Sequence, residues 1–179
     1  MEQLIMRWKN DGKDAKIPEI PEDVLLEIFP NIKNAEFEWC EIVKHMEQDK
    51  PLEINDEKEF FNRMMKPYPY FEENKCFFLL VNETPAATVT VICNREKKEG
   101  YIHMVSCKPQ FRGRGLGTLL NDIALFTLKN EGMKTAYLTT DDWRVPAIKS
   151  YLRAGFSPDL ETHVDFKMRW DDICKIING

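Results

Sequence analysis

A glycine-rich stretch between residues 110 and 118 carries the clearest chemical signal in the sequence. It reads Gln110-Phe111-Arg112-Gly113-Arg114-Gly115-Leu116-Gly117-Thr118, with glycine at three alternate positions. Glycine lets the backbone approach a ligand closely, and the amides of a helix's first turn point outward at the positive end of its dipole. Arg112 and Arg114 would add charge-assisted donors for phosphate oxygens, and Thr118 a hydroxyl. The stretch therefore predicts a site for a diphosphate.

The spacing of the glycines excludes two common kinds of phosphate loop. It matches neither G-x-x-x-x-G-K-S/T, the mononucleotide pattern, nor G-x-G-x-x-G, the dinucleotide pattern. Glycines that only turn a corner are the alternative interpretation, which the flanking arginines disfavour.

The segments on either side of the loop predict a strand followed by a helix. Tyr101 to Cys107 is rich in β-forming residues and is stopped by Pro109, which cannot donate to a sheet ladder. Residues 116 to 128 carry apolar side chains at helical spacing. Upstream, Cys76 to Val81 and Ala86 to Cys93 predict two more strands joined by a short hairpin loop. The loop thus follows a run of three strands and opens a helix.

A second cluster of signals follows that helix. Thr135 to Thr140 predicts a further strand, and Pro146 suits the first turn of another helix. Apolar residues at helical spacing continue from Ala147 to Leu152, and Gly155 ends the segment. The intervening loop reads Asp141-Asp142-Trp143-Arg144.

Together the two clusters resemble the GNAT acetyltransferase superfamily. The acyl-CoA loop of that family follows Q/R-x-x-G-x-G/A, and its later A-I/V-x-x-Y-x-x-x-G-F segment is met by residues 147 to 156. Two motifs in the family's order form a specific signal. The loop pattern is met twice, by Gln110, Gly113 and Gly115 and by Arg112, Gly115 and Gly117.

The resemblance implies a fold and a division of the chain. It implies a single α/β domain over residues 1–179, with a central, mostly antiparallel mixed sheet. This sheet would splay between the family's fourth and fifth strands and carry helices on both faces. Residues 76–170 would form the acetyl-CoA-binding core, and residues 1–75 would supply an N-terminal strand and helices on the acceptor side.

The resemblance also implies a reaction and a cofactor site. The reaction would move an acetyl group from acetyl-CoA to a primary amine of a small molecule or peptide, in one ternary complex and without a metal. Residues 105 to 109 resemble the end of the family's fourth strand, whose exposed backbone pairs with the pantetheine arm. The implied cofactor-binding residues are Val105, Ser106, Cys107, Gln110, Arg112, Gly113, Arg114, Gly115, Leu116, Gly117 and Thr118.

Tyr151 is the first catalytic candidate. It falls on the tyrosine that in many relatives lies beside the thioester sulfur and protonates the departing thiolate, so the resemblance implies a general acid. A tyrosine that packs its ring and hydrogen-bonds through its hydroxyl is the alternative. One departure stands nearby: Arg144 occupies a position where the family often has asparagine, and Asp141, Asp142 or Trp143 would then line the acceptor pocket.

His103 is the candidate base, because an acceptor ammonium must lose a proton before it can attack. Strand alternation would put Tyr101, His103, Val105 and Cys107 on one face, and imidazole titrates near neutrality. A histidine with a purely structural role is the alternative. A covalent intermediate on Cys107 is disfavoured, because its setting suits a buried thiol.

The remaining segments predict further elements. Leu4 to Trp8 indicates a first strand, and Pro21 could open a short helix over Val24 to Ile28. Helical spacing returns from Phe37 to Met46. Asn55-Asp56 resembles an N-cap for a further helix. The apolar residues of that helix, Phe60, Phe61, Met64 and Met65, would either form a core or line a substrate cleft. Residues 163 to 170 should add the last strand.

Composition bounds the partners. The net charge of -5 argues against nucleic acid, because phosphate contacts need clustered positive charge. Five scattered cysteines without C-x-x-C spacing predict neither disulfides nor a zinc site. No apolar run reaches the roughly 18 residues of a membrane span, and no signal peptide is recognisable, so we expect a cytoplasmic protein without a membrane partner. A homodimer is left open.

Two other classes of function compete with the enzyme. One is a non-catalytic sensor that binds acyl-CoA, and the other is a protein interaction domain that keeps the fold without the cofactor. The glycine loop and Tyr151 disfavour the interaction domain. Fold alone does not separate the sensor from an enzyme.

Overall fold

One mixed sheet organises the chain, for which a computed structural model describes residues 2–46 and 50–178. The strand order is β2-β3-β4-β5-β6-β1-β7, with every pairing antiparallel except that of β5 with β6. The strands are β1 Leu4–Lys9, β2 Val24–Ile28, β3 Cys76–Val81, β4 Thr84–Asn94, β5 Glu99–Cys107, β6 Thr135–Thr140 and β7 Ser157–Pro158. The helices are α1 Ala35–Val43, α2 Glu57–Met65, α3 Leu116–Asn130, α4 Val145–Arg153 and α5 Phe166–Asn178. The predicted mixed α/β class is confirmed.

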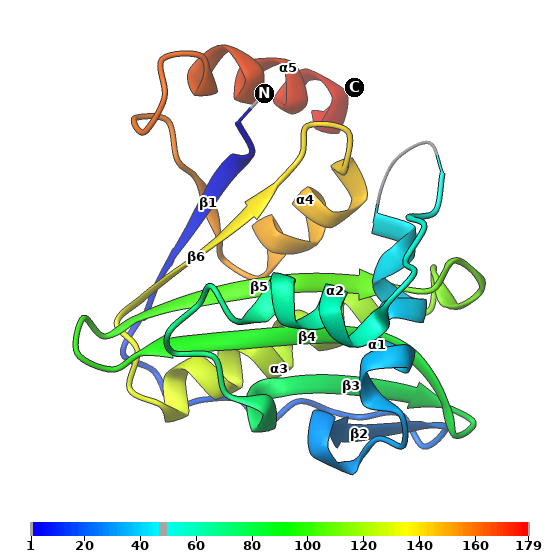
Figure 1. The fold of residues 1–179 in the computed structure, drawn as a ribbon. Helices are drawn as coiled ribbons and strands as arrows, with labels where there is room; N and C mark the ends of the chain where they lie inside the picture. The colour runs from blue at the N-terminus through cyan, green and yellow to red at the C-terminus, as the bar shows by residue number, and fades with distance from the viewer. Residues whose placement is uncertain (1, 47–49, 179) are drawn as a thin grey trace.

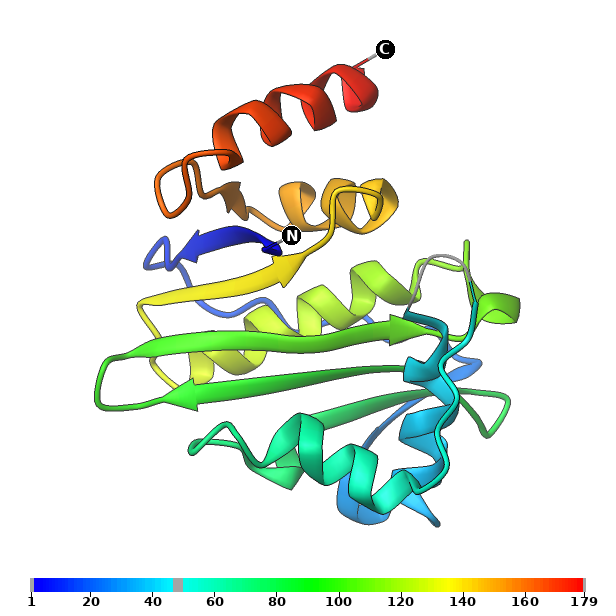
Figure 2. The same ribbon diagram turned by 45° about the horizontal axis from the view of Figure 1, so that its top comes forward.

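Helices cover both faces of the central strands, as Figure 2 shows, with α3 on one face and α1 and α2 on the other. On the α3 face, Leu120, Ala124 and Leu128 are fully buried against strand residues such as Val91. On the opposite face, Trp39 of α1 packs edge-on against Phe61 of α2, with ring centroids 5.1 Å apart. The strands that lead to the glycine loop are thus packed between two layers of apolar side chains.

The predicted hairpin and the predicted cap of α2 are both confirmed. Asn82 and Glu83 turn between β3 and β4 with φ values of 47° and 64°, the left-handed pair that suits the twist of a two-residue hairpin. The Asp56 carboxylate accepts a hydrogen bond of 2.7 Å from the Glu59 amide, which satisfies one free donor at the start of α2.

The sheet opens between β5 and β6, as predicted. These parallel strands pair only from Glu99 opposite Thr135 to Ile102 opposite Leu138. Beyond that point β5 continues to Cys107 while β6 turns away, and Figure 1 shows the two strands diverging like a V. The β5 edge that faces β6 therefore has no ladder partner from His103 onward within the described residues.

A bulge in β5 corrects the predicted strand face. The β4–β5 register shifts between Thr88 and Thr90, and Met104 has φ 57°, so β5 carries an extra residue. The bulge reverses the alternation, because Val105 and Cys107 pack into the α3-side core whereas Met104 packs with the α1–α2 cluster. The expectation that these two residues share a face with Tyr101 and His103 is therefore wrong.

Two secondary-structure predictions are also wrong. Residues Val24 to Ile28 form strand β2 rather than a helix, because pairing with β3 from Val81 to Phe77 outweighs the local helix signal after Pro21. Residues 163 to 170 do not add a strand. Phe166, Trp170 and Ile173 recur at helical spacing and are buried together on α5, so the apolar period there is helical.

The N-terminal strand takes an unexpected place in the sheet. β1 lies between β6 and the short β7, with Leu4 opposite Thr140 and Met6 opposite both Leu138 and Pro158. Leu4 and Met6 are fully buried. Residues from the start of the chain thus flank the opened side of the sheet.

Candidate active site

The glycine loop forms an open cradle of backbone amides at the start of α3. Gly113 and Gly115 adopt left-handed φ values of 78° and 79°, and Gly115 is the N-cap residue. The first helical hydrogen bond runs from the Leu119 amide to the Gly115 carbonyl. Within the described chain, the preceding amides from residue 113 to 118 have no acceptor, so they are free for an anion.

The three glycines of the loop have room beside their backbone. A methyl group added at Gly113, Gly115 or Gly117 would meet no atom within 4 Å. Gln110 and Thr118 are exposed beside it, whereas the Leu116 side chain is buried in the core, so only the backbone of Leu116 can reach a ligand. The predicted glycine site is thus accessible and lies at the positive end of a 15-residue helix.

The two arginines of the loop are already engaged. The Arg112 guanidinium donates to the carbonyls of Cys107 and His45, at 3.3 and 3.2 Å. Arg114 forms an ion pair with Asp23 just before β2. Arg112 therefore links the end of β5 to the turn after α1. Arg114 could contact a phosphate only if it left the Asp23 carboxylate or bound both groups at once.

The unpaired edge of β5 connects the cradle to a cleft within the splay. Ser106 turns its hydroxyl toward α1, where it donates to the Ile42 carbonyl at 3.0 Å. Val105 and Cys107 pack into the α3-side core. The side chains of the three predicted residues thus face the protein interior, and only the strand edge is presented to a ligand.

The cleft has a volume of about 210 Å³ and lies where β5 and β6 part. Its walls come from five places in the chain: the residue before β1, the turn after α1, α2 with its following loop, strands β5 and β6, and α4 with the residue before it. It is lined by Gln3, Met46, Met64, Tyr68, Tyr101, Ile102, His103, Met104, Val105, Ser106, Leu138, Thr139, Arg144 and Tyr151. Both predicted catalytic residues are among them.

Tyr151 has the features of a proton donor in this cleft. Its side chain is buried at 6% exposure, and its hydroxyl makes no hydrogen bond with the described residues. Burial raises the pKa of Tyr151 to about 12, although the positive charge of Arg144 opposes that rise. The phenol therefore stays protonated at neutral pH and can donate to a ligand.

His103 is buried, and both of its ring nitrogens are occupied. One nitrogen, Nε2, lies 3.2 Å from the Met64 carbonyl, which can only accept, so Nε2 carries the hydrogen. Nδ1 lies 3.1 Å from the Tyr101 hydroxyl and so accepts from it. Burial lowers the pKa of His103 to about 4, partly opposed by the Met64 carbonyl. The imidazole is neutral at pH 7 and is reached from the cleft through Tyr101.

Cys107 is poorly placed as a nucleophile. Its thiol lies 3.5 Å from the Lys108 carbonyl, and burial raises the pKa of Cys107 above its ordinary value, against the opposing charge of Arg112. A thiolate is therefore scarce at neutral pH.

Arg144, rather than its acidic neighbours, lines the cleft. Its Nε lies 3.0 Å from an Asp141 carboxylate oxygen, and its Nη2 donates to the Met46 carbonyl. Asp142 instead forms a two-pronged pair with the buried Arg169 of α5. The Trp143 ring stacks against the Arg144 guanidinium, whose central carbon lies 4.8 Å from the centre of the ring. None of these three neighbours is among the residues that line this cleft.

Several cleft residues carry no signal in the sequence. Tyr68 follows α2, and Gln3 precedes β1, where its amide donates to Asp141 at 3.1 Å. Met46 and Met104 belong to an irregular turn and to the bulge, respectively. Of the apolar residues on α2, Met64 lines the cleft while Phe61 and Met65 are core. Only the helical period of α2 hinted at any of them.

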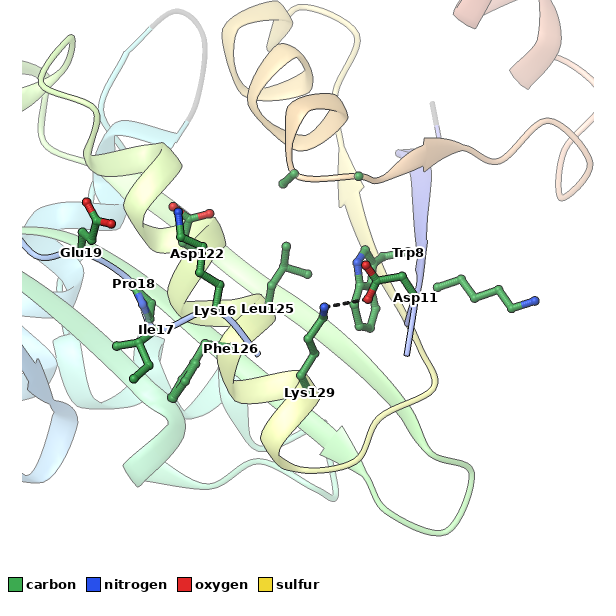
Figure 3. Close-up of a pocket in the computed structure, with 13 residues that line it drawn as sticks. Trp8, Asp11, Lys16, Ile17, Pro18, Glu19, Asp122, Leu125, Phe126 and Lys129 are labelled. Atoms are coloured by element: carbon green, nitrogen blue, oxygen red, sulfur yellow. Dashed lines mark hydrogen bonds and ion pairs between the residues drawn. The ribbon is translucent and has the colours of Figure 1, made fainter. Parts of the chain in front are cut away.

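A second and larger pocket lies away from this site. It measures about 450 Å³ and is bounded by the outer face of α3, the end of β1 and the segment around residues 16–19. Figure 3 shows Trp8, Leu125 and Phe126 along it, with the Lys129 ammonium paired to Asp11 at 2.8 Å. It contains neither the glycine loop nor Tyr151, so it is separate from the cradle and the cleft.

In the part of the chain that the structure describes, no helix is long and apolar enough to cross a membrane. In the same part of the chain, no group of three or more histidine, cysteine, aspartate or glutamate side chains is arranged to hold a metal ion.

Comparison with known proteins assigns the family. A profile of the Acetyltransferase (GNAT) family matches residues 38–156, more than half of the chain, and the chain therefore belongs to that family. An uncharacterized N-acetyltransferase of Methanocaldococcus jannaschii is 34% identical over 102 residues, which cover 54% of this chain and 43% of that protein. The chain thus spans less than half of this relative.

Solved structures share the fold at low sequence identity. A GCN5-related N-acetyltransferase from Sphaerobacter thermophilus superposes with a TM-score of 0.64 at 17% identity, over 87% of this chain and 48% of that one. The ribosomal-protein-S18-alanine N-acetyltransferase of Escherichia coli gives 0.58 at 19% identity, over 75% of this chain and 77% of that one.

Proposed function

We propose that this member of the GNAT family transfers an acetyl group from acetyl-CoA to the primary amine of a small acceptor. The observation that carries the proposal is the unpaired edge of β5, which runs from the Tyr151-lined cleft to the open amide cradle of the glycine loop. A linear ligand with an acyl thioester at one end and a diphosphate further along would contact all three. The N-acetyltransferase names of the relatives support nitrogen as the acceptor atom.

We assign the diphosphate to the amides of residues 113 to 118. The free donors and the dipole of α3 favour an anion there, with Arg112 and Arg114 at the rim. The pantetheine arm would add to the unpaired edge of β5 beside Val105 to Cys107, as an extended ligand adds to a strand. The thioester would then lie in the cleft near Tyr151.

The chemistry is a direct acyl transfer. The neutral amine attacks the thioester carbonyl, and the carbon–nitrogen bond forms as the carbonyl opens to a tetrahedral oxyanion. The carbon–sulfur bond breaks as the carbonyl re-forms. An amide of β5 near Val105 would stabilise the tetrahedral oxyanion. Tyr151 would give its proton to the departing thiolate, and solvent would later restore it. Proximity of the two bound reactants supplies much of the rate.

His103 keeps a role in the proposal, but not as the group that touches the amine. Its free lone pair points at the Tyr101 hydroxyl, so a proton from the acceptor could reach it only through Tyr101. Tyr101 lies beside the cleft, where its oxygen is 3.5 Å from the Thr139 hydroxyl. We therefore propose that His103 acts through Tyr101 and does not touch the amine itself.

The test measures cofactor binding and turnover on one protein preparation. Acetyl-CoA is titrated by calorimetry, and release of free thiol is then followed with a broad panel of amines. Saturable binding with amine-dependent thiol release supports the enzyme. Binding without release from any amine would favour a sensor of acyl-CoA, and the absence of binding would favour an interaction domain.

A further inference from the structure

The acceptor end of the cleft is walled by aromatic rings. The Tyr68 ring lies 5.3 Å from that of Tyr101 and 4.7 Å from that of His103, measured between centroids. Tyr137 stacks on Tyr101 with ring centroids 4.6 Å apart and an interplanar angle of 15°. These rings come from β5, β6 and the loop after α2, and they support one another. Such a wall favours a flat apolar partner.

The same cleft offers no carboxylate to an ammonium ion. Among its described lining residues the only formal charge is the guanidinium of Arg144, which is positive. A cationic acceptor would have to leave water without a carboxylate of its own in the cleft, because the Asp141 carboxylate beside it is already paired with Arg144 at 3.0 Å. The cleft therefore favours an acceptor that enters uncharged.

The volume of the cleft limits the size of the acceptor. A cavity of about 150 Å³ is enough for one benzene ring. At about 210 Å³, this cleft has room for one ring with an amino group and the transferred acetyl group. Larger acceptors would have to extend out of it.

The requirements of proton transfer also favour an acceptor amine that is neutral at pH 7. A strongly basic amine with a pKa of roughly 10 arrives as an ammonium, and a base of pKa about 4, such as His103, would hold its proton about a millionfold more weakly. An amine bonded directly to an aromatic ring shares its lone pair with the ring and is neutral at pH 7. It needs no base before it attacks.

We propose that the acceptor is a small arylamine, an amine whose nitrogen is bonded directly to an aromatic ring, held against the wall of Tyr68 and Tyr101. The proposal rests on the acetyltransferase function above. As the nitrogen bonds to the carbonyl carbon and the thiolate leaves with the Tyr151 proton, the surplus proton on nitrogen passes to the Tyr101 oxygen. The Tyr101 hydroxyl lies 3.1 Å from Nδ1 of His103, so its own proton shifts to that nitrogen, and the pair returns a proton to the cleft when the product leaves.

Two isomeric amines test this directly. 4-Methylaniline and benzylamine have the same atoms and nearly the same size, but only the first has its nitrogen on the ring. Thiol release from acetyl-CoA is measured with each, from about pH 6 to about pH 9. We expect kcat/KM for 4-methylaniline at pH 7 to exceed that for benzylamine by at least about tenfold and to change little with pH. Faster transfer to benzylamine would overturn the proposal and assign the rings to cation binding.

Variants of the wall provide the second measurement. Tyr68→Leu should raise KM for 4-methylaniline about tenfold while acetyl-CoA binding stays unchanged. Tyr70→Leu is the matched control, because it changes the same residue type in the same loop outside the cleft. Equal KM values for the two variants would contradict the proposed wall.

The amine panel separates this inference from the function on which it rests. Thiol release with peptides or polyamines, but with neither isomer, would leave the acetyltransferase standing and overturn the arylamine class. No release with any amine despite acetyl-CoA binding would overturn both.

Discussion

The cradle and the cleft lie at opposite ends of one strand edge, yet they are built from different materials. The cradle uses backbone amides of consecutive residues, arranged by Gly113 and Gly115 and by the start of α3. The cleft uses side chains from both ends of the sequence, from Gln3 to Tyr151. A site made of one continuous segment is fixed by local backbone conformation, whereas a site made of distant side chains depends on the whole fold.

The difference predicts how each site responds to mutation. A change in the cradle should act on the cofactor alone and leave the cleft intact. A change in the cleft should alter turnover while acetyl-CoA still binds. The following predictions test that separation, in order of expected size.

Gly115→Glu should have the largest effect. It places a carboxylate at the N-cap, in the open space proposed for the diphosphate, so acetyl-CoA affinity should fall by more than about a thousandfold in calorimetry. Gly132→Glu is the matched control. It makes the same change at a left-handed glycine with open surroundings, but at the other end of α3, and it should bind like the wild type. Equal losses in both variants would mean that strain, not ligand contact, explains the effect.

Tyr151→Phe should lower kcat by about a hundredfold to a thousandfold and leave the calorimetric affinity for acetyl-CoA unchanged, because only the proton donor is removed. The wild-type rate should show no alkaline decline from this group below about pH 12, since its raised pKa keeps it protonated. If the variant kept the wild-type kcat, Tyr151 would have only a packing role.

His103 should make the fold sensitive to acid. Its pKa is about 4 in the folded chain and roughly 6.5 when unfolded, so below about pH 6.5 the unfolded chain binds a proton that the folded chain excludes. Its contribution is present above pH 6.5 and is lost as pH falls to about 4, by about 3 kcal/mol of unfolding free energy. His103→Gln should remove this part of the slope in urea titrations at several pH values. Identical slopes in both proteins would contradict the burial of a neutral imidazole.

Cys107→Ala should have the smallest effect. A thiol whose pKa is raised by burial takes no part in direct transfer, so kcat/KM should stay within about threefold of the wild type. Rapid-mixing measurements should show no burst of free thiol without an acceptor. A burst that disappears in the variant would establish a covalent intermediate instead.

The cradle could be predicted because its determinants are local. Alternating glycines and a following helical period specify the loop conformation within nine residues, and Tyr151 is identified by a motif that lies inside one helix. The hairpin and the Asp56 cap are equally local. The hairpin and the cap are confirmed because no distant contact was needed to fix them, whereas the roles of the loop and of Tyr151 stay predictions.

Most of the missed features depend on contacts between distant segments; α5 is the exception, because its apolar period is local and helical. β2 forms a strand because β3 is there to pair with it, and the bulge at Met104 arises from its register against β4. Asp142 is withdrawn from the cleft by Arg169, a residue of the last helix. Tyr68 reaches the cleft because the loop after α2 brings its ring against Tyr101 and His103 of β5. None of these pairings has a signature in the separate segments.

The place of β1 between β6 and β7 also sets the order in which the protein can fold. Leu4 is synthesised long before Thr140, its partner, so the earliest strand must wait for one of the latest. Contacts of such sequence separation slow folding, because the chain loses loop entropy before they form. During that interval the apolar side chains of Leu4, Met6 and Trp8 lack their sheet and are open to chaperones and to aggregation. Because β1 flanks the opened side of the sheet, the cleft is completed late in folding.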